Sequence, residues 1–446
     1  MPATEASLGA ATAPAQPGLK RVLSRGFAIS AVIGGIIGLG VLRTPGEIAK
    51  VVTNPWAFAG LWVAGGLFVV LSTLVVGELI GLSPRSGGPY VLVRRGLGPY
   101  PGFVMGWVDW LSFVADIALK AVVVVEYAAL LAPIDGVSKT GVPMVLITVF
   151  AVLQLRGARL GAGIQRLAAA FIALSVVGFT LMLVLAPSVP AVSAPAEARS
   201  GLSAWALVIA SIIFTYDGWI YACYFGGEVK GGGRELALSC VRGILVVFLL
   251  YVGLMASLAF SVPLTNLAGE NLALAAALEQ AVSPFAATLV VACAVVILLA
   301  HQNLLFLGAP RILYALSVDR LGTERAARIG RRGNPLFAVL ASWSVAMVLL
   351  LAGGFEFLLQ LCVFFFVLLY VGLLTGLLIL RRKEAEAERP FRAWGHPVTT
   401  VFCLVCWTAV TLFQGISEPE TALYALIMIA VSLPVYMWLK RVRHLR

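Results

Sequence analysis

Residues 211–221 read SIIFTYDGWIY, and this stretch decides how the chain is interpreted. It places Asp217, Gly218 and four aromatic side chains inside an apolar run, 203–227, that is long enough to cross a bilayer. A carboxylate at that depth is costly unless it has a partner, so Asp217 is a candidate functional residue. The glycine favours an interruption of the helix at the same point.

A second interruption lies earlier in the chain, where residues 33–41 read IGGIIGLGV. Each glycine lowers helix stability by about 1 kcal/mol relative to alanine, so the run predicts local unwinding that lets a ligand reach the backbone. Close packing of helices through small residues is the alternative. The two interruptions fall in the first span of each five-span half of the chain. Paired broken helices are typical of transporters with inverted repeats.

The composition predicts an all-α membrane protein that crosses the bilayer many times. The chain has 446 residues, of which 61% are hydrophobic and 12% charged, and its mean hydropathy is +0.99. This exceeds what a soluble domain carries and supplies about a dozen spans of roughly 20 residues. The apolar runs are continuous, which excludes the alternating pattern of a β-barrel. We expect spans at 27–48, 57–82, 101–132, 141–155, 167–187, 203–227, 241–263, 281–308, 335–352, 355–380, 398–416 and 420–439.

The basic residues predict the orientation. Most of the 32 Lys and Arg residues fall in segments on the same side as the N-terminus, whereas Lys50, Lys139 and Arg199 fall on the other side. By the positive-inside rule, both termini lie in the cytoplasm and the chain is a multi-pass protein of the inner or plasma membrane. The formal charge of +11 is spread beside the spans, so we expect no nucleic-acid partner. Residues 1–19, rich in Ala and Pro, are predicted to be a disordered cytoplasmic tail, and 441–446 a cytoplasmic tail.

The segments between the spans are short, which leaves no room for a soluble catalytic domain, so we expect no enzyme activity. The six cysteines lie in or at the ends of predicted spans. Cys403 and Cys406 form a CxxC pattern inside an apolar run, where small apolar filler residues are the simpler interpretation. We expect no disulfide, no metal and no cofactor.

Five sequence blocks resemble the amino acid/polyamine/organocation superfamily of permeases, and within it the L-type amino acid transporter branch. The blocks occur in the family's order between about residues 20 and 440. They are IIGLGVLRTPG (36–46), GELIGLSPRSGGPYVLVRRGLGPYPGFVMGW (77–107), FTYDGWIYACYFGGE (214–228), LGAPRILYALSVDRLG (307–322) and ERPFRAWGHPV (388–398).

The resemblance implies a single permease domain, 20–440, with a leucine-transporter-like fold. Its two inverted five-helix repeats are 27–187 and 203–380, and two extra helices occupy 398–439. It also implies transport by alternating access. An amino acid carboxylate is then bound by backbone N–H groups of the first-span break, and its ammonium by carbonyls of the sixth-span break, which includes Gly218. The implied residues are Ile37, Gly38, Leu39 and Gly40 for the carboxylate, and Phe214, Thr215 and Tyr216 for the ammonium. Phe214 or Tyr216 resembles an aromatic gate, unless it only packs in a helix interface.

Asp217 stands where the L-type branch usually has glycine, and three roles stay open for it. It could select a cationic or hydroxylated substrate side chain, carry a coupling proton, or pair with a neighbouring span. Asp116 and Lys120 are four residues apart on one helix face, so we expect them to neutralise each other. Glu78 and Glu228 are expected to form an inner ion-pair gate or to cap helices.

The coupling mode is open. By resemblance, proton-coupled members carry a lysine in the fifth span about seven residues after a glutamine that matches Gln165, and here that position is Ile172. Sodium-coupled relatives use eighth-span hydroxyls, but 291–306 contains no Ser or Thr. The coupling modes that remain open are exchange, facilitated diffusion, and symport of a proton carried by Asp217 or His301. His301 titrates in the right range, but a lone histidine within a span is more often a satisfied core residue.

The partners follow from this interpretation: an amino acid substrate and the lipid bilayer. The alternatives are a polyamine or other organic cation as substrate and a non-transporting amino acid sensor, for which the short loops offer little surface. No cysteine lies around Pro133–Gly141, so we expect no disulfide-linked accessory subunit like that of animal L-type transporters.

Overall fold

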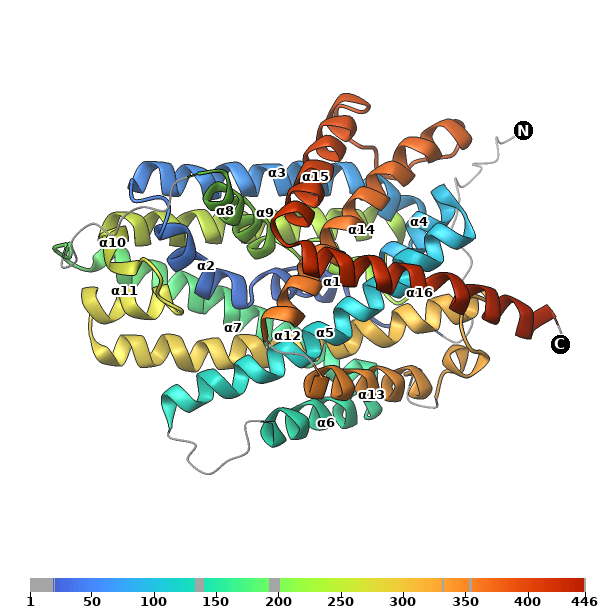
Figure 1. Ribbon diagram of the computed structural model, residues 1–446, viewed down its shortest axis with the longest axis horizontal. Coiled ribbons are helices and arrows are strands. Elements are labelled where there is room, and N and C mark those ends of the chain that lie inside the picture. Colours follow the sequence, from blue (N-terminus) through green and yellow to red (C-terminus); the bar gives the residue numbers. More distant parts are fainter. Residues whose placement is uncertain are drawn as a thin grey trace, which may run out of the picture.

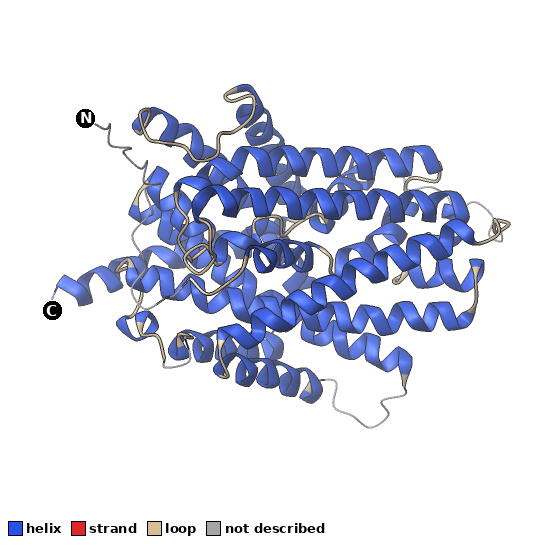
Figure 2. Ribbon diagram, turned by 180° about the vertical axis from the view of Figure 1, so that it is seen from behind, coloured by secondary structure: helices blue, strands red, loops and turns tan. Residues whose placement is uncertain are grey.

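The computed structural model describes residues 19, 21–132, 140–191, 201–330, 333–352 and 355–444. These residues form helices and loops, with no strand among them beyond two isolated bridges (Figure 2). The α-helices are α1 (Arg25–Ile36), α2 (Leu39–Ala49), α3 (Pro55–Leu82), α4 (Pro89–Leu97), α5 (Pro99–Leu131), α6 (Gly141–Leu155), α7 (Ala158–Leu185), α8 (Leu202–Thr215), α9 (Gly232–Ser261), α10 (Leu264–Leu267), α11 (Ala273–Ala281), α12 (Pro284–Val318), α13 (Leu336–Ala352), α14 (Phe355–Lys383), α15 (Val398–Ser417) and α16 (Pro419–His444). Two 3₁₀ turns, η1 (Tyr221–Tyr224) and η2 (Glu324–Ala327), complete the set.

Several helix starts follow from local capping chemistry. The Ser24 hydroxyl accepts the N–H of Phe27 at the start of α1, at 3.2 Å. Asn54 accepts two N–H groups at the start of α3, where Pro55 occupies the first helical position. Ser283 and Pro284 repeat this arrangement at α12. A capping side chain satisfies N–H groups that a helix leaves unpaired, and proline loses nothing at the first position.

The helices form a bundle with α1 and α2 running through its middle (Figure 1). Helix α9 packs along α3 and α1, and α12 packs along α5 and α7. At one end, the chain before α1 pairs with the chain before α9 through the bond from Leu23 N–H to the Glu228 carbonyl, at 2.9 Å. At the other end, the Gly269 N–H donates to the Gly46 carbonyl at 2.9 Å. The broken helix formed by α1 and α2 therefore crosses the whole bundle.

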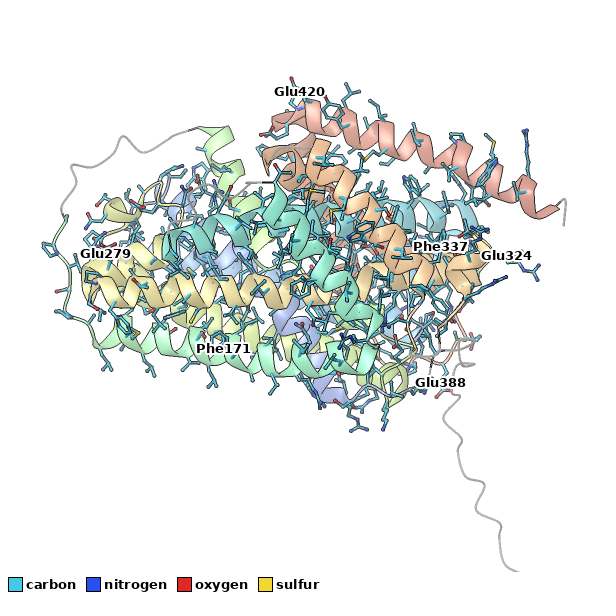
Figure 3. All side chains as sticks on the ribbon, turned by 90° about the horizontal axis from the view of Figure 1, so that it is seen from below. Phe171, Glu279, Glu324, Phe337, Glu388 and Glu420 are labelled. Atoms are coloured by element: carbon cyan, nitrogen blue, oxygen red, sulfur yellow. The ribbon has the colours of Figure 1, made fainter. Side chains whose placement is uncertain are left out.

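The outer surface is apolar, as expected for contact with lipid. Leu167 and Leu174 of α7 are 77% and 71% exposed, and Phe171 lies on the same outer face (Figure 3). Carboxylates such as Glu279 and Glu324 lie instead at opposite ends of the long axis (Figure 3). This separation of apolar flanks from charged ends is that of a protein embedded in a bilayer.

Eight helices of the described residues are long and apolar enough to cross a membrane by length and composition. Two further apolar helices, Gly141–Leu155 and Leu336–Leu351, are shorter, and the 33-residue α5 carries Asp109, Asp116, Lys120 and Glu126. The all-helical, multi-pass prediction is thus confirmed. A total of twelve spans and the inverted repeat remain predictions. Residues 1–18 of the predicted N-terminal tail lie outside the described residues, as do residues 133–139, on which the expectation about an accessory subunit depends. Of the predicted C-terminal tail, 441–444 continue α16 and only 445–446 lie outside the described residues.

Candidate functional site

The predicted interruption of the first span is present between α1 and α2. Helix α1 ends at Ile36, Ile37 and Gly38 have non-helical backbones, and α2 starts at Leu39. The N-cap residue of α2 is Gly38, which has no side chain to cap the helix. The first N–H groups of a helix have no partner within the helix and carry partial positive charge, so this buried start of α2 is suited to bind an anion.

The sixth span is interrupted at the predicted place as well. Helix α8 ends at Thr215, residues 216–220 form turns, and η1 follows. The turn is closed by the Asp217 N–H, which donates to the Phe214 carbonyl at 3.2 Å. The end of α8 is the partially negative end of a helix, where carbonyl oxygens are suited to bind a cation.

The two breaks lie against each other. Gly218 has φ +103°, and a Cβ on it would lie 2.5 Å from the carbonyl oxygen of Gly35. A Cβ on Gly40 would lie 2.8 Å from Cα of Thr215. Such approaches exclude any side chain, which explains glycine at both positions. The positive start of α2 and the negative end of α8 are therefore neighbours in the core of the bundle.

The two candidate gate residues have different surroundings. Tyr216 is fully buried, with its ring 5.1 Å from that of Tyr251 and 6.1 Å from that of Trp62. Its hydroxyl donates to the Trp62 carbonyl at 3.1 Å. Phe214 is partly exposed. Tyr216 thus occupies a helix interface between α3 and α9, and Phe214 is left as the candidate for a moving aromatic.

Asp217 is paired with a neighbouring span. It accepts a hydrogen bond from the Tyr370 hydroxyl of α14, and the rings of Tyr370 and Trp219 stack at 4.8 Å. Asp217 as a whole residue is partly exposed. The third of the roles left open for Asp217, pairing with another helix, is therefore realised in this structure, and Tyr370 joins the site although nothing in its local sequence marks it.

A second polar cluster lies beside the first-span break. Asp116 and Lys120 of α5 form the expected ion pair, and both are buried. His301 of α12 lies next to them, with Nε2 3.8 Å from Oδ2 of Asp116. A Cβ on Gly38 would lie 3.0 Å from its Nδ1. Ile172, at the position where the resemblance places a lysine in relatives, is fully buried in the apolar core.

Glu78 and Glu228 both form ion pairs, with partners from distant parts of the chain. Glu78 binds Arg381 and Arg389, and accepts the N–H of Ala393 at 2.7 Å. Glu228 binds Arg311 through two contacts, one of them 2.9 Å long, and both side chains are 3% exposed. These pairs join α3 to the end of α14 and to the segment after it, and the segment before α9 to α12.

Asp319, directly after α12, is a further carboxylate with partners from a distant part of the chain. It binds Arg85 at 2.8 Å and also Arg94, and accepts the Tyr90 hydroxyl at 3.0 Å. Burial raises the pKa of Asp319, but the hydrogen bonds from Arg85 and Arg94 outweigh burial and hold the pKa below its usual value. Asp319 is therefore an ionised group that joins the end of α12 to α4 and to the loop before α4.

No group of three or more His, Cys, Asp or Glu residues that could hold a metal occurs in the described part of the chain. The polar side chains of the site are a few carboxylates, tyrosines, one lysine and one histidine, distributed around two helix ends of opposite polarity. Such an arrangement can bind a small molecule that carries both a negative and a positive charge.

Comparisons with known proteins agree with this chemistry. Residues 25–433 match the family described as "Amino acid permease". The chain is 22% identical to the serine/threonine exchanger SteT of Bacillus subtilis (strain 168), over 95% of this chain and 98% of that protein. It is 23% identical to the gamma-aminobutyric acid permease of the same organism, over 87% of each. It is 25% identical to the human cystine/glutamate transporter, over 96% of this chain and 88% of that protein.

Proposed function

Because the chain belongs to the amino acid permease family of the amino acid/polyamine/organocation superfamily, we propose that it is a secondary transporter that carries an amino acid across the cell membrane by alternating access. The observation that carries the proposal is the contact between the two helix breaks, which brings the positive start of α2 beside the negative end of α8. Members of the family are transporters and not enzymes.

The substrate carboxylate binds at the first-span break. Its ligands are the backbone N–H groups of Ile37, Gly38, Leu39 and Gly40. The Ile37 N–H already donates to the Ile33 carbonyl at 3.0 Å, so a carboxylate there shares or replaces that bond. The N-cap residue of α2 is Gly38, which has no side chain to accept the N–H groups of the first turn, and a buried donor without an acceptor is costly. Glycine at 38 and 40 keeps the backbone within reach of a ligand.

The substrate ammonium binds at the sixth-span break. Its ligands are the carbonyl oxygens of Phe214, Thr215 and Tyr216, at the end of α8, with Gly218 allowing the break to approach α1. A zwitterion placed in this way brings no net charge into the membrane. Phe214, which is partly exposed, closes over the substrate as the gate.

Asp217 contributes to this site through its bond to Tyr370, which holds the sixth-span break against α14. Its carboxylate inside the membrane-spanning region is also the feature that would suit a polyamine or another organic cation. We favour an amino acid, because the named relatives over most of the chain are an amino acid exchanger, an amino acid permease and a cystine/glutamate transporter.

The proposed architecture has twelve spans, with inverted repeats at 27–187 and 203–380 and two extra helices after them. Both termini lie in the cytoplasm. The ion pairs of Arg95 with Glu384 and of Arg381 with Glu78 support the orientation, since they put basic residues at the end of the bundle where α1 begins.

Counterflow tests the proposal. Purified protein is reconstituted into liposomes loaded with one unlabelled amino acid, and entry of the labelled form of the same amino acid is followed. The assay is repeated for each of the common amino acids. We expect transient accumulation of at least one amino acid. Binding of an amino acid, measured as thermal stabilisation, without any flux would favour a sensor and would contradict transport.

A further inference from the structure

His301 is a buried histidine whose ring nitrogens have no hydrogen-bond partner among the described residues. It is 5% exposed, and both Nδ1 and Nε2 lack a hydrogen bond. A neutral imidazole has one donor and one acceptor, and a buried polar atom without a partner loses the hydrogen bond that it makes to water in the unfolded chain. Packing alone does not account for a histidine here, because an apolar residue of similar size would avoid that loss.

The two ring nitrogens face different parts of the site. Nδ1 faces the first-span break, where a Cβ on Gly38 would lie 3.0 Å away. Nε2 faces Asp116, with 3.8 Å to Oδ2. The ring therefore lies between the proposed carboxylate-binding backbone on one side and a buried carboxylate on the other.

The charged and titratable groups around the ring come from α5, η1, the sixth-span break and α14. Helix α5 contributes Asp116 and Lys120, and η1 contributes Tyr221, whose ring is 5.9 Å from that of His301. In the sixth-span break and on α14, Asp217 and Cys362 lie within electrostatic reach of Asp116 and Lys120. Between α1 and α2, the described neighbour of the ring is the backbone at Gly38. Gln165 of α7 accepts a hydrogen bond from Asn303, two residues after His301 on α12, at 3.2 Å.

The charge balance couples the ring to the substrate. With the site empty, Lys120 neutralises Asp116, so the surroundings favour a neutral imidazole in this buried place. A substrate carboxylate bound at residues 37–40 adds a negative charge on the Nδ1 side. A protonated ring can then donate from Nδ1 toward the substrate and from Nε2 toward Asp116, which satisfies both nitrogens.

We propose that His301 is the proton-binding site that couples transport to the proton gradient: one proton binds to its ring together with each amino acid. The inference rests on the proposed amino acid transport and adds the coupling ion to it. Substrate and proton bind cooperatively, because each strengthens the binding of the other by the same factor. The proton enters on the imidazole and leaves from it when the substrate leaves, so no other reactant is needed.

The test uses the full chain in liposomes, with an amino acid that counterflow has identified. The membrane potential is clamped at zero, and the outside is made one pH unit more acidic than the inside. With one proton per substrate, wild-type protein should concentrate the amino acid inside by up to about tenfold and acidify the interior. Counterflow that is present but indifferent to the pH gradient would overturn the inference and leave the proposed function intact. Absence of counterflow for every amino acid would overturn the proposed function itself.

Variants test whether His301 is the residue that binds the coupled proton. His301→Gln keeps a donor near the break, so we expect slower but measurable counterflow with no gradient-driven accumulation. Its substrate affinity, measured by thermal stabilisation, should also no longer increase as the pH falls. His396→Gln is the matched control, because His396 lies in the loop before α15 and contacts Thr400; it should accumulate substrate like the wild type. Accumulation by His301→Gln equal to that of wild type would contradict the assignment.

Discussion

Gly218→Ala tests whether contact between the two breaks sets the binding site. Two costs add at this position. A side chain at φ +103° is held in a backbone region that costs about 1–2 kcal/mol for an L-residue. The new Cβ would also lie 2.5 Å from the Gly35 carbonyl oxygen and 2.7 Å from its carbon. These are backbone atoms that cannot rotate away, so overpacking adds about 1–3 kcal/mol.

The total of about 2–5 kcal/mol is relieved if the sixth-span break moves away from α1. Binding must then bring the breaks together again, so we expect the affinity for substrate to fall by at least about tenfold, at about 1.4 kcal/mol per factor of ten. The dissociation constant is measured from ligand-induced thermal stabilisation of the purified protein, which follows the ratio of ligand concentration to dissociation constant.

Gly60→Ala and Gly178→Ala are matched controls, because nothing lies within 4 Å of a Cβ at either position. Both glycines lie within helices, α3 and α7, where alanine is intrinsically favoured by about 1 kcal/mol. They should bind substrate like the wild type. If Gly218→Ala matches these controls in both affinity and melting temperature, the breaks do not form the site through this contact.

Three further predictions concern buried polar contacts. Arg311→Met leaves Glu228 unpaired and should lower the free energy of unfolding by about 3–5 kcal/mol; a melting temperature equal to that of wild type would show that the pair is dispensable. Tyr370→Phe removes the hydrogen bond to Asp217 and should cost about 1–3 kcal/mol by the same measurement. Asp319 has a lowered pKa in the folded state, so its stabilisation is complete above about pH 4, its unfolded pKa, and declines as the pH falls through its folded pKa. Melting curves of Asp319→Asn and wild type should therefore converge on acidification, and a constant difference would refute this.

The spans could be predicted from sequence because continuous apolar runs are a local property. The run at 27–48 predicted one span with a break at its glycines, and the structure has α1 and α2 with the break at Ile37 and Gly38. Helices α4 and α11 were not predicted. Each has 9 residues and lies outside the apolar runs of span length, so a search for spans passes over it.

The candidate site was predictable where its signal is local and not where it depends on packing. The Asp116–Lys120 pair follows from i, i+4 spacing on one helix. The bond of Tyr370 to Asp217 joins residues 153 positions apart, and no sequence pattern marks Tyr370 as a partner. Likewise, the sequence offers His301 as a titratable residue, but only the fold brings its Nδ1 to Gly38.

The most direct measurement of the central claim, that a zwitterion is held between two helix ends, is competition in counterflow. The transported amino acid, its methyl ester and the amine formed by its decarboxylation are compared as competitors for entry of the labelled amino acid. We predict that the free amino acid competes fully, and that the ester and the amine compete at least about tenfold more weakly, since each has lost the anionic group that the start of α2 binds. Equal competition by the amine would contradict the account and favour an organic-cation carrier.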